Sequence, residues 1–361
     1  MDLKDKIKSL PLSPGVYLMK NSYGDIIYVG KSKSLKNRVS SYFQNSRNHP
    51  PKIERLIKTL KDFDYILTDT EFEAFMLECE LIKKFQPIYN KQMKSTASYI
   101  YIEIDTDKAN LSVKTVNVPN EKHSNVHFGP YTSKNTVEKA IQGIKEFYKI
   151  DCSSSSKRNT PCLNYSLGLC IGMCLGGKAL EKHAEITNRI INLFNGEDMN
   201  IIEEMEQKMI FSSKNYDFET AAKYRDYISA IKSLINKEKV IEFAEANRNI
   251  LVVENLDDSK IKLFLIKGNK ILFKEKYDLS DINEMQLLSN IKKNIMNYFK
   301  NNESGIIKKI SKEDIDEAQI IYSYLKSNNC NYVIIPNEWL DTNDEANIES
   351  MISGLINLDS K

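Results

Sequence analysis

The sequence predicts a multidomain protein of the mixed α/β (α+β) class, with a small antiparallel sheet and helices first, then a Cys-rich segment, a helical hairpin and a C-terminal α/β region. Three observations carry this prediction. Strand-like and helical patterns alternate near both ends of the chain. Four of the six cysteines fall within one short segment, and the stretch from Glu181 to about Lys239 has helical spacing almost throughout. A chain of 361 residues is long enough for two or three domains of ordinary size.

The first predicted domain, residues 1–95, begins with a hairpin. Val16–Lys20 and Asp25–Val29 have strand patterns, and the polar loop between them contains Gly24. Phe63–Thr68 is a plausible third strand. Helices are expected at about Ser34–Phe43, after Pro50-Pro51, and over residues 71–85, where Phe72, Phe75, Met76, Cys79, Ile82 and Phe85 follow one helical stripe.

The remaining chain is predicted to form three further parts. Residues 96–180 are a linker region with the Cys-rich cluster, and they include a hairpin within 98–118 and a helix at about 134–148. Residues 181–240 form a helical hairpin, interrupted near Asn195-Gly196 and Lys214-Asn215. Residues 241–361 alternate strand-like pieces with a helix at about Ile282–Phe299.

Composition and charge exclude several classes of protein. Hydrophobic content of 41% and charged content of 28% are ordinary for a soluble protein, and no apolar run approaches the ~18 residues of a membrane span. The N-terminal MDLKDKIKSLPLSPG lacks the apolar core of a signal peptide, so a cytoplasmic location is expected. Residues 1–100 carry a net charge of +6 and the remainder −4. Clustered cations favour phosphate binding, so this asymmetry is a weak indication of a polyanion site in the first domain. Ordinary solvated lysines are the alternative explanation.

Tyrosines and basic side chains crowd into the front hairpin and the helix that follows it. Their spacing on two adjacent strands and one helical face allows them to converge. The convergent set is Tyr17, Tyr28, Lys31, Arg38 and Tyr42.

Glu78 adds a carboxylate inside the apolar helix AFMLECELI, where a charge costs energy unless it is paired or binds a cation. Taken singly, each of these residues also fits a structural role, as a strand aromatic, a solvated helix charge or a salt-bridged glutamate. Together they predict a site for phosphate and metal.

The paired tripeptides Gly15-Val16-Tyr17 and Tyr28-Val29-Gly30 carry a family resemblance. With Lys31, Arg38, Glu78 and Asn90 at matching positions, residues 10–92 resemble the GIY-YIG endonucleases, in the version found in the UvrC family of nucleotide excision repair. The resemblance implies a metal-dependent DNA endonuclease.

Roles for the individual residues follow from this resemblance and from the chemistry of phosphodiester hydrolysis. Tyr28 would be the general base, which requires a pKa well below ~10, lowered by the Lys31 ammonium and a metal-bound water. Arg38 would donate to the scissile phosphate, and Glu78 would hold one Mg²⁺ or Mn²⁺. Tyr17 and Tyr42 would orient water or phosphate, and Asn90 would support the site.

The cysteine segment has the spacing C-x9-C-x7-C-x3-C, formed by Cys152, Cys162, Cys170 and Cys174. Four thiolates suit a tetrahedral Zn²⁺ or an iron–sulfur cluster, and spacing alone does not choose between them. Reduced cysteines packed as small hydrophobes are the third reading. The segment is similar to the cysteine region that follows the UvrC nuclease domain, and that resemblance implies a 4Fe–4S cluster. For either metal, a structural role is expected.

The hairpin sequence NYDFETAAKYRDYISAIKSL places an apolar stripe on one helical face, with Arg225 inside it. Two short helices cannot bury such a stripe by themselves, so a second helical pair, from this chain or another, is expected to cover it. The stretch resembles the UVR motif, which implies binding to UvrB through Phe218, Ala222 and Arg225. An internal bundle helix is the alternative.

The last region, 241–361, resembles the start of the C-terminal half of UvrC, which in the family leads to a ribonuclease-H-like nuclease and a helix–hairpin–helix DNA binder. In UvrC the front nuclease makes the incision 3′ to the lesion. The resemblance therefore implies incision 3′ to a lesion in double-stranded DNA bound by UvrB. The alternatives are a UvrB-binding module that modulates repair without cutting, and a truncated fragment of a dual-incision excinuclease.

Overall fold

In the computed structural model, the chain divides into two compact units, one formed by residues 1–96 with 242–361 and the other by residues 97–241. The structure describes residues 3–44, 50–91, 93, 99–106, 112–119, 125–152, 160–300, 312–342 and 344–356. Each unit has its own hydrophobic clusters. The mixed α/β class predicted from the sequence is confirmed, with helices and small antiparallel sheets in both units.

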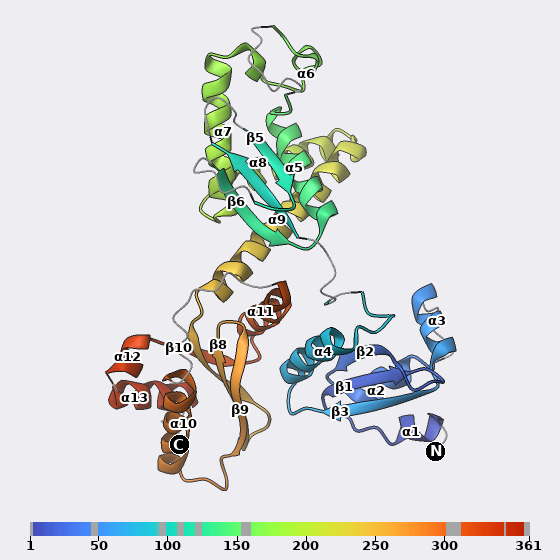
Figure 1. The fold of residues 1–361 in the computed structure, drawn as a ribbon, viewed down its shortest axis with the longest axis vertical. Coiled ribbons are helices and arrows are strands. Elements are labelled where there is room, and N and C mark those ends of the chain that lie inside the picture. The colour runs from blue at the N-terminus through green and yellow to red at the C-terminus, as the bar shows by residue number, and fades with distance from the viewer. Residues whose placement is uncertain are drawn as a thin grey trace. The chain divides into compact units, whose positions relative to one another are not determined.

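The front sheet has the order β2-β1-β3, with all pairs antiparallel (Figure 1). Its strands are β1 (Gly15–Lys20), β2 (Ile26–Ser32) and β3 (Asp62–Leu67), which confirms the three predicted strands. Tyr17 pairs with Gly30, and Met19 pairs with Tyr28. Because side chains alternate along a strand, this register places Tyr17 and Tyr28 on the same face of the sheet.

Four helices accompany this sheet: α1 (Leu3–Lys8), α2 (Leu35–Ser41), α3 (Pro51–Thr59) and α4 (Glu71–Phe85). On one face, Leu35 and Val39 of α2 pack with Tyr17. On the other face, Ala74, Leu81 and Ile82 of α4 pack against Val16, Leu18 and Val29. The front sheet is therefore enclosed between α2 and α4, as Figure 1 also shows.

The local sequence explains where α4 begins and ends. The Thr70 side chain accepts a hydrogen bond from the Glu73 N–H, which satisfies a donor of the first turn. Gln86 adopts a left-handed conformation (φ 47°) immediately before Pro87, so the helix stops there.

The C-terminal part of the same unit is a four-stranded antiparallel sheet of order β10-β7-β8-β9. Its strands are β7 (Asn249–Asn255), β8 (Lys260–Lys267), β9 (Lys270–Asp278) and β10 (Asn331–Ile335). Helices α10 (Glu284–Ile295), α12 (Asn337–Asp341) and α13 (Glu345–Ile356) pack against one face. The other face is covered by α11 (Lys312–Leu325) and by α4. Helix α4 thus contributes to two cores.

The middle unit combines a three-stranded sheet with long helices. Strands β4 (Ile100–Asp105), β5 (Ser112–Val116) and β6 (Asn125–Tyr131) have the order β5-β4-β6. The predicted hairpin is confirmed, whereas β6 was not predicted, because Gly129-Pro130 weakens its strand pattern. The helices are α5 (Lys134–Tyr148), α6 (Leu163–Ser166), α7 (Lys178–Phe194), α8 (Asn200–Lys214) and α9 (Phe218–Glu245), with a 3₁₀ turn at Met173–Leu175.

None of the helices in the described ranges is long and apolar enough to cross a membrane.

Candidate active site

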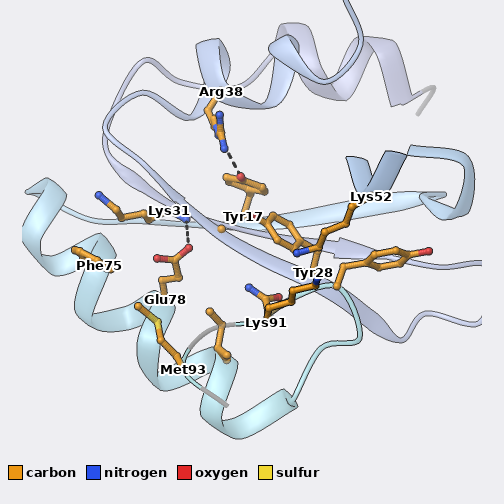
Figure 2. Close-up of a pocket in the computed structure, with 13 residues that line it drawn as sticks. Tyr17, Tyr28, Lys31, Arg38, Lys52, Phe75, Glu78, Lys91 and Met93 are labelled. Atoms are coloured by element: carbon orange, nitrogen blue, oxygen red, sulfur yellow. Dashed lines mark hydrogen bonds between the residues drawn. The ribbon is translucent and has the colours of Figure 1, made fainter. Parts of the chain in front are cut away.

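A cavity of about 550 Å³ opens along β2, the edge strand of the front sheet (Figure 2). Six of the seven predicted catalytic residues line it, and the seventh, Tyr42, is hydrogen-bonded to one of them. The lining residues are Tyr17, Tyr28, Gly30, Lys31, Arg38, Lys52, Phe75, Glu78, Ile82, Tyr89, Asn90, Lys91 and Met93.

Tyr17, Tyr28 and Arg38 form one side of the cavity, and Tyr42 is hydrogen-bonded to Tyr17 next to it. The hydroxyl groups of Tyr17 and Tyr42 are 2.8 Å apart, and Arg38 Nε donates to the Tyr17 hydroxyl at 3.4 Å. The Tyr17 ring lies 6.1 Å from the Tyr28 ring and 6.0 Å from the Tyr42 ring. The Arg38 guanidinium also lies over the Tyr42 ring, at 5.3 Å. These contacts hold a cation and three hydroxyl groups around one space.

Glu78 and Lys31 form the opposite side. The main-chain N–H of Lys31 donates to Glu78 Oε1 at 3.0 Å, so strand β2 fixes the carboxylate that α4 presents. The Lys31 ammonium lies 2.7 Å from Glu71 Oε1 and 4.3 Å from the centre of the Phe75 ring. Figure 2 shows the Lys31 side chain directed toward Phe75 and away from Tyr28.

The edge position of β2 explains why this site forms here. An edge strand leaves main-chain groups without a neighbouring strand, and buried groups of this kind need partners. Asn90 supplies them at Val29, because its Oδ1 accepts from the Val29 N–H at 3.0 Å and its Nδ2 donates to the Val29 oxygen at 2.9 Å. Glu78 accepts the main-chain N–H of Lys31. Asn90 therefore holds the main chain of β2 at Val29.

Gly30 is required by the packing of Tyr17. A Cβ atom at position 30 would lie 2.3 Å from the Tyr17 hydroxyl oxygen, and Tyr17 is fully buried. Only glycine leaves room for this tyrosine opposite it in the hairpin. The glycine of the second tripeptide, Tyr28-Val29-Gly30, is thus required for a steric reason.

Burial changes the ionisation of the site. Burial, followed by the neighbouring Tyr42 and then by the Glu78 carboxylate, raises the pKa of Tyr28. Burial also raises the pKa of Glu78, although the Lys31 N–H opposes this shift. The Lys31 ammonium is paired with Glu71 in this structure, and the lowering of the Tyr28 pKa by that ammonium together with a metal-bound water stays a prediction.

Three charged residues of the site were missed by sequence reasoning. Glu71 holds the Lys31 ammonium, and Lys52 and Lys91 add positive charge to the cavity wall. Glu71 lies two turns before Glu78 on the same helix, so its spacing was a usable signal. The positions of Lys52 and Lys91 depend on how two separate segments fold onto β2, which no local pattern indicates.

The four cysteines lie together in the middle unit. The sulfur atoms of Cys152, Cys162 and Cys174 all lie within 4.8 Å of one another, and the Cys152 and Cys162 sulfurs are 3.8 Å apart. Cys170 belongs to the same buried cluster, and its sulfur accepts the Gly172 N–H at 3.3 Å. Main-chain N–H groups also point at the other sulfurs, from Tyr165 to Cys162 and from Cys162 to Cys174. The three grouped sulfurs fit a thiolate-bound metal, whereas the sulfur of Cys170, the predicted fourth ligand, does not lie within the same distance of all three.

The α8–α9 hairpin divides the stripe that the sequence predicted. Ile228 and Ile231, in the second half of the stripe, are buried in the core of the middle unit. This half therefore packs inside the chain, as the alternative of an internal bundle helix predicted. Phe218 is 63% exposed, and Ala222 is half-buried. Arg225 is exposed and paired with Asp226, and its predicted contact with a partner stays a prediction. The exposed half includes a patch formed by Ile210, Phe211, Tyr216 and Phe218, which we call the hairpin-tip patch.

Comparisons with known families match most of the chain in three consecutive segments. Residues 13–91 match a UvrC-like GIY-YIG domain, and residues 99–193 match the middle domain of the UvrC/Cho excinucleases. Residues 200–234 match the UvrB/uvrC motif. The helical hairpin with its exposed tip therefore coincides with the third match.

Curated relatives are named UvrABC system protein C. That of Alkaliphilus oremlandii is 38% identical over 288 residues, covering 78% of this chain and 46% of the relative. Those of Clostridioides difficile and Acetivibrio thermocellus are each 35% identical, covering 90% and 93% of this chain and 55% of each relative. The chain thus spans about half the length of the curated relatives it matches.

Among solved structures, the front of the chain is similar to the GIY-YIG N-terminal endonuclease domain of UvrC from Thermotoga maritima, determined with magnesium as its catalytic divalent cation. The two are 40% identical, with a TM-score of 0.23, and the match covers 25% of this chain and 96% of that domain.

Proposed function

The resemblance to UvrC is confirmed over the three matched segments, and from it we propose that this chain is a DNA endonuclease of nucleotide excision repair. The proposed reaction is a metal-dependent incision 3′ to a lesion in double-stranded DNA held by UvrB. The observation that carries the proposal is the convergence of Tyr28, Lys31, Arg38, Glu78 and Asn90 on one cavity.

A divalent cation is supported by the chemistry of the donor at Glu78. A carboxylate held by a main-chain N–H offers hard oxygen atoms, which suit Mg²⁺ or Mn²⁺ with water completing the shell. One such ion, when bound, supplies positive charge against the phosphate and the leaving oxygen. Glu78 is the residue proposed to hold it.

The other side chains have roles that follow from their positions. Arg38 presents its guanidinium to the cavity beside Tyr17 and is proposed to bind the scissile phosphate. Tyr28 is proposed to take the proton of the attacking water. Because burial raises its pKa, this role requires additional positive charge in the complex with substrate. Tyr17 and Tyr42 orient this arrangement through their shared hydrogen bond.

Recruitment to damaged DNA is proposed to use the hairpin-tip patch. Phe218 and Tyr216 contact each other edge to face and are both exposed. Exposed aromatic side chains on a match to the UvrB/uvrC motif fit a docking site for UvrB. A UvrB-binding module without nuclease activity is the alternative, and the assembled cavity argues against it. A fragment of a dual-incision excinuclease is the other alternative.

The cysteine cluster is proposed to bind a structural metal centre. The family resemblance implies a 4Fe–4S cluster. The 3.8 Å spacing of two sulfurs favours a second candidate, because thiolates bound at ~2.3 Å to one tetrahedral zinc lie about this far apart. In an iron–sulfur cube each cysteine binds its own iron, which separates the sulfurs further.

The nuclease proposal is tested by replacing the metal-binding carboxylate. We expect Glu78→Gln to lower incision of lesion-bearing duplex by at least about a hundredfold in the presence of UvrA, UvrB and Mg²⁺ or Mn²⁺. Glu80→Gln is the matched control, since Glu80 is exposed on the same helix. Glu78→Gln cutting as fast as the parent would show that the site is misassigned. An inert parent protein would favour the non-cutting module.

The metal proposal has a separate test. Protein purified without oxygen is expected to contain iron and sulfide and to absorb broadly near ~400 nm if the cluster is 4Fe–4S. Colourless protein with one zinc per chain would select the second candidate. Cys174→Ser should lower the bound metal in either case, because Cys174 is buried within the sulfur group. Unchanged metal content in that variant would contradict a thiolate site.

A further inference from the structure

Helix α4 has three faces. One packs on the front sheet, one lines the cavity, and the third packs against the C-terminal sheet. Phe72 is buried there and stacks on Tyr324 of α11, with ring centres 3.8 Å apart and planes 3° from parallel. Phe264 of β8 meets the Phe72 ring edge to face at 5.2 Å. Cys79, two turns further along the helix, is fully buried in the same cluster. This face therefore belongs to a continuous core shared with residues 242–361.

Charged groups at the start of α4 add a second kind of contact. Glu73 is 4% exposed and lies 3.1 Å from the ammonium groups of both Lys262 and Lys274. Asp69 lies 2.7 Å from the ammonium groups of Lys262 and Lys276. All three lysines come from β8 and β9. Glu73 and Lys262 are buried, so removing either one would leave an uncompensated charge on the other.

The other end of the helix is held as well. Lys83 lies 2.8 Å from Glu317 of α11, and both side chains are largely buried. The contact with the C-terminal region thus extends along most of α4, from Asp69 to Lys83.

The same helix carries the carboxylates of the candidate active site. Glu78 precedes Cys79 in sequence, yet its side chain lines the cavity, and Glu71 holds the Lys31 ammonium. An α-helix moves as a rigid element over a few turns, so a force on one face displaces the side chains on the others.

From this arrangement we propose that the C-terminal α/β region acts as a clamp that positions α4, and so sets the affinity of the Glu78 site for its divalent cation. Glu317 and Lys262 are positioning residues in this view, because they act on the site through α4. The inference rests on the proposed function only in taking the cavity to bind a cation.

The test begins with Glu317→Lys in the full chain, which places a like charge beside Lys83. Two quantities are measured: the binding of Mn²⁺, followed by electron paramagnetic resonance, and the labelling rate of the Cys79 thiol, followed by peptide mass spectrometry. We expect labelling to become at least about tenfold faster and the half-saturating Mn²⁺ concentration to rise about fivefold. Incision at saturating Mn²⁺ should stay within about twofold of the parent, because the catalytic side chains are unchanged.

Four further variants make the result specific. The swap Lys83→Glu with Glu317→Lys restores an ion pair and is expected to restore both quantities. Glu349→Lys breaks the Lys292–Glu349 pair inside the C-terminal region and should change neither. Lys276→Ala removes a half-exposed partner of Asp69 and provides a milder perturbation should Glu317→Lys not fold. Glu78→Gln identifies the Mn²⁺ bound at this site.

Each result decides the inference. Unchanged Cys79 labelling would show that α4 is not held by this contact. Faster labelling with an unchanged Mn²⁺ titration would show that the contact does not position the site, and either outcome overturns the proposal. A parent chain that binds Mn²⁺ at Glu78 but cuts no DNA would contradict the proposed function, while the Mn²⁺ titration would still decide the clamp.

Discussion

The cavity along β2 and the hairpin-tip patch present their side chains in opposite ways. In the cavity, Tyr17 is fully buried and Asn90 is 9% exposed, and each is held by hydrogen bonds from other elements. At the hairpin tip, Tyr216 is 83% exposed and Phe218 is 63% exposed. A reacting group must be in place before substrate arrives, whereas a docking group gains its stabilisation only when a partner covers it.

This difference predicts that the cavity is intolerant of a single added methyl group. We expect Gly30→Ala to lower incision by at least about a hundredfold, because the new Cβ forces Tyr17 away from Tyr42 and Arg38. The loss of stability is expected to be about 1–3 kcal/mol, measured by denaturant unfolding.

Gly354→Ala serves as the control, since a Cβ there meets nothing within 4 Å. Full activity in Gly30→Ala would show that the Tyr17 position is not needed for cutting, and the contrast between the two regions would then be lost.

The hairpin tip should respond in the reverse sense, with a loss of recruitment and no loss of folding. We expect Phe218→Ala to lower incision of UvrB-bound lesions by about tenfold, equivalent to ~1.4 kcal/mol. Its melting temperature should match the parent, because an exposed side chain contributes little to the core.

Glu219→Ala, at the next exposed position, should leave incision unchanged. A Phe218→Ala protein that melts without cooperativity would place Phe218 in an internal core and contradict docking through the tip.

A third prediction compares the pH dependence of stability in the middle unit with that in the front sheet. Burial lowers the pKa of His183 on α7 to about 4, below its usual value of 6.5. The unfolded chain therefore binds a proton near pH 6.5 that the folded middle unit refuses, so stability present above pH 6.5 is lost as the pH falls toward 4. The loss is on the order of 2–3 kcal/mol.

Hydrogen exchange between pH 7 and 4.5 measures this loss. Amides of α7 should lose protection ahead of those of β1 and β2. His183→Gln should remove much of the pH dependence of α7, and an unchanged profile in that variant would assign the acid sensitivity to other groups.

Local sequence patterns determined most of the secondary structure. The strands of the front sheet and the helices at 71–85 and 134–148 follow from alternation, helical periodicity and capping residues, all of which act over a few neighbours. Six of the residues that line the cavity were also predicted, because the hairpin register and one helical face bring most of them to the same edge.

The tertiary structure decided how the elements share their surfaces. The apolar stripe of α4 was expected to be a single face, but Ile82 packs on the front sheet and Cys79 on the C-terminal sheet. A helical pattern reports which side chains are apolar and not which core receives them. Glu73 and Lys262 similarly gave no local signal of their pairing, since 189 positions of sequence separate them.

The same distinction applies to the chemistry of the site. The sequence by itself determined that a tyrosine, a lysine, an arginine and a carboxylate lie close to one strand edge. Only the tertiary structure decided that Lys31 is paired with Glu71 and that burial raises the pKa of Tyr28. The physical reason is that residue types and spacing follow from the chain, whereas solvation and charge pairing depend on which distant segments exclude water around each group.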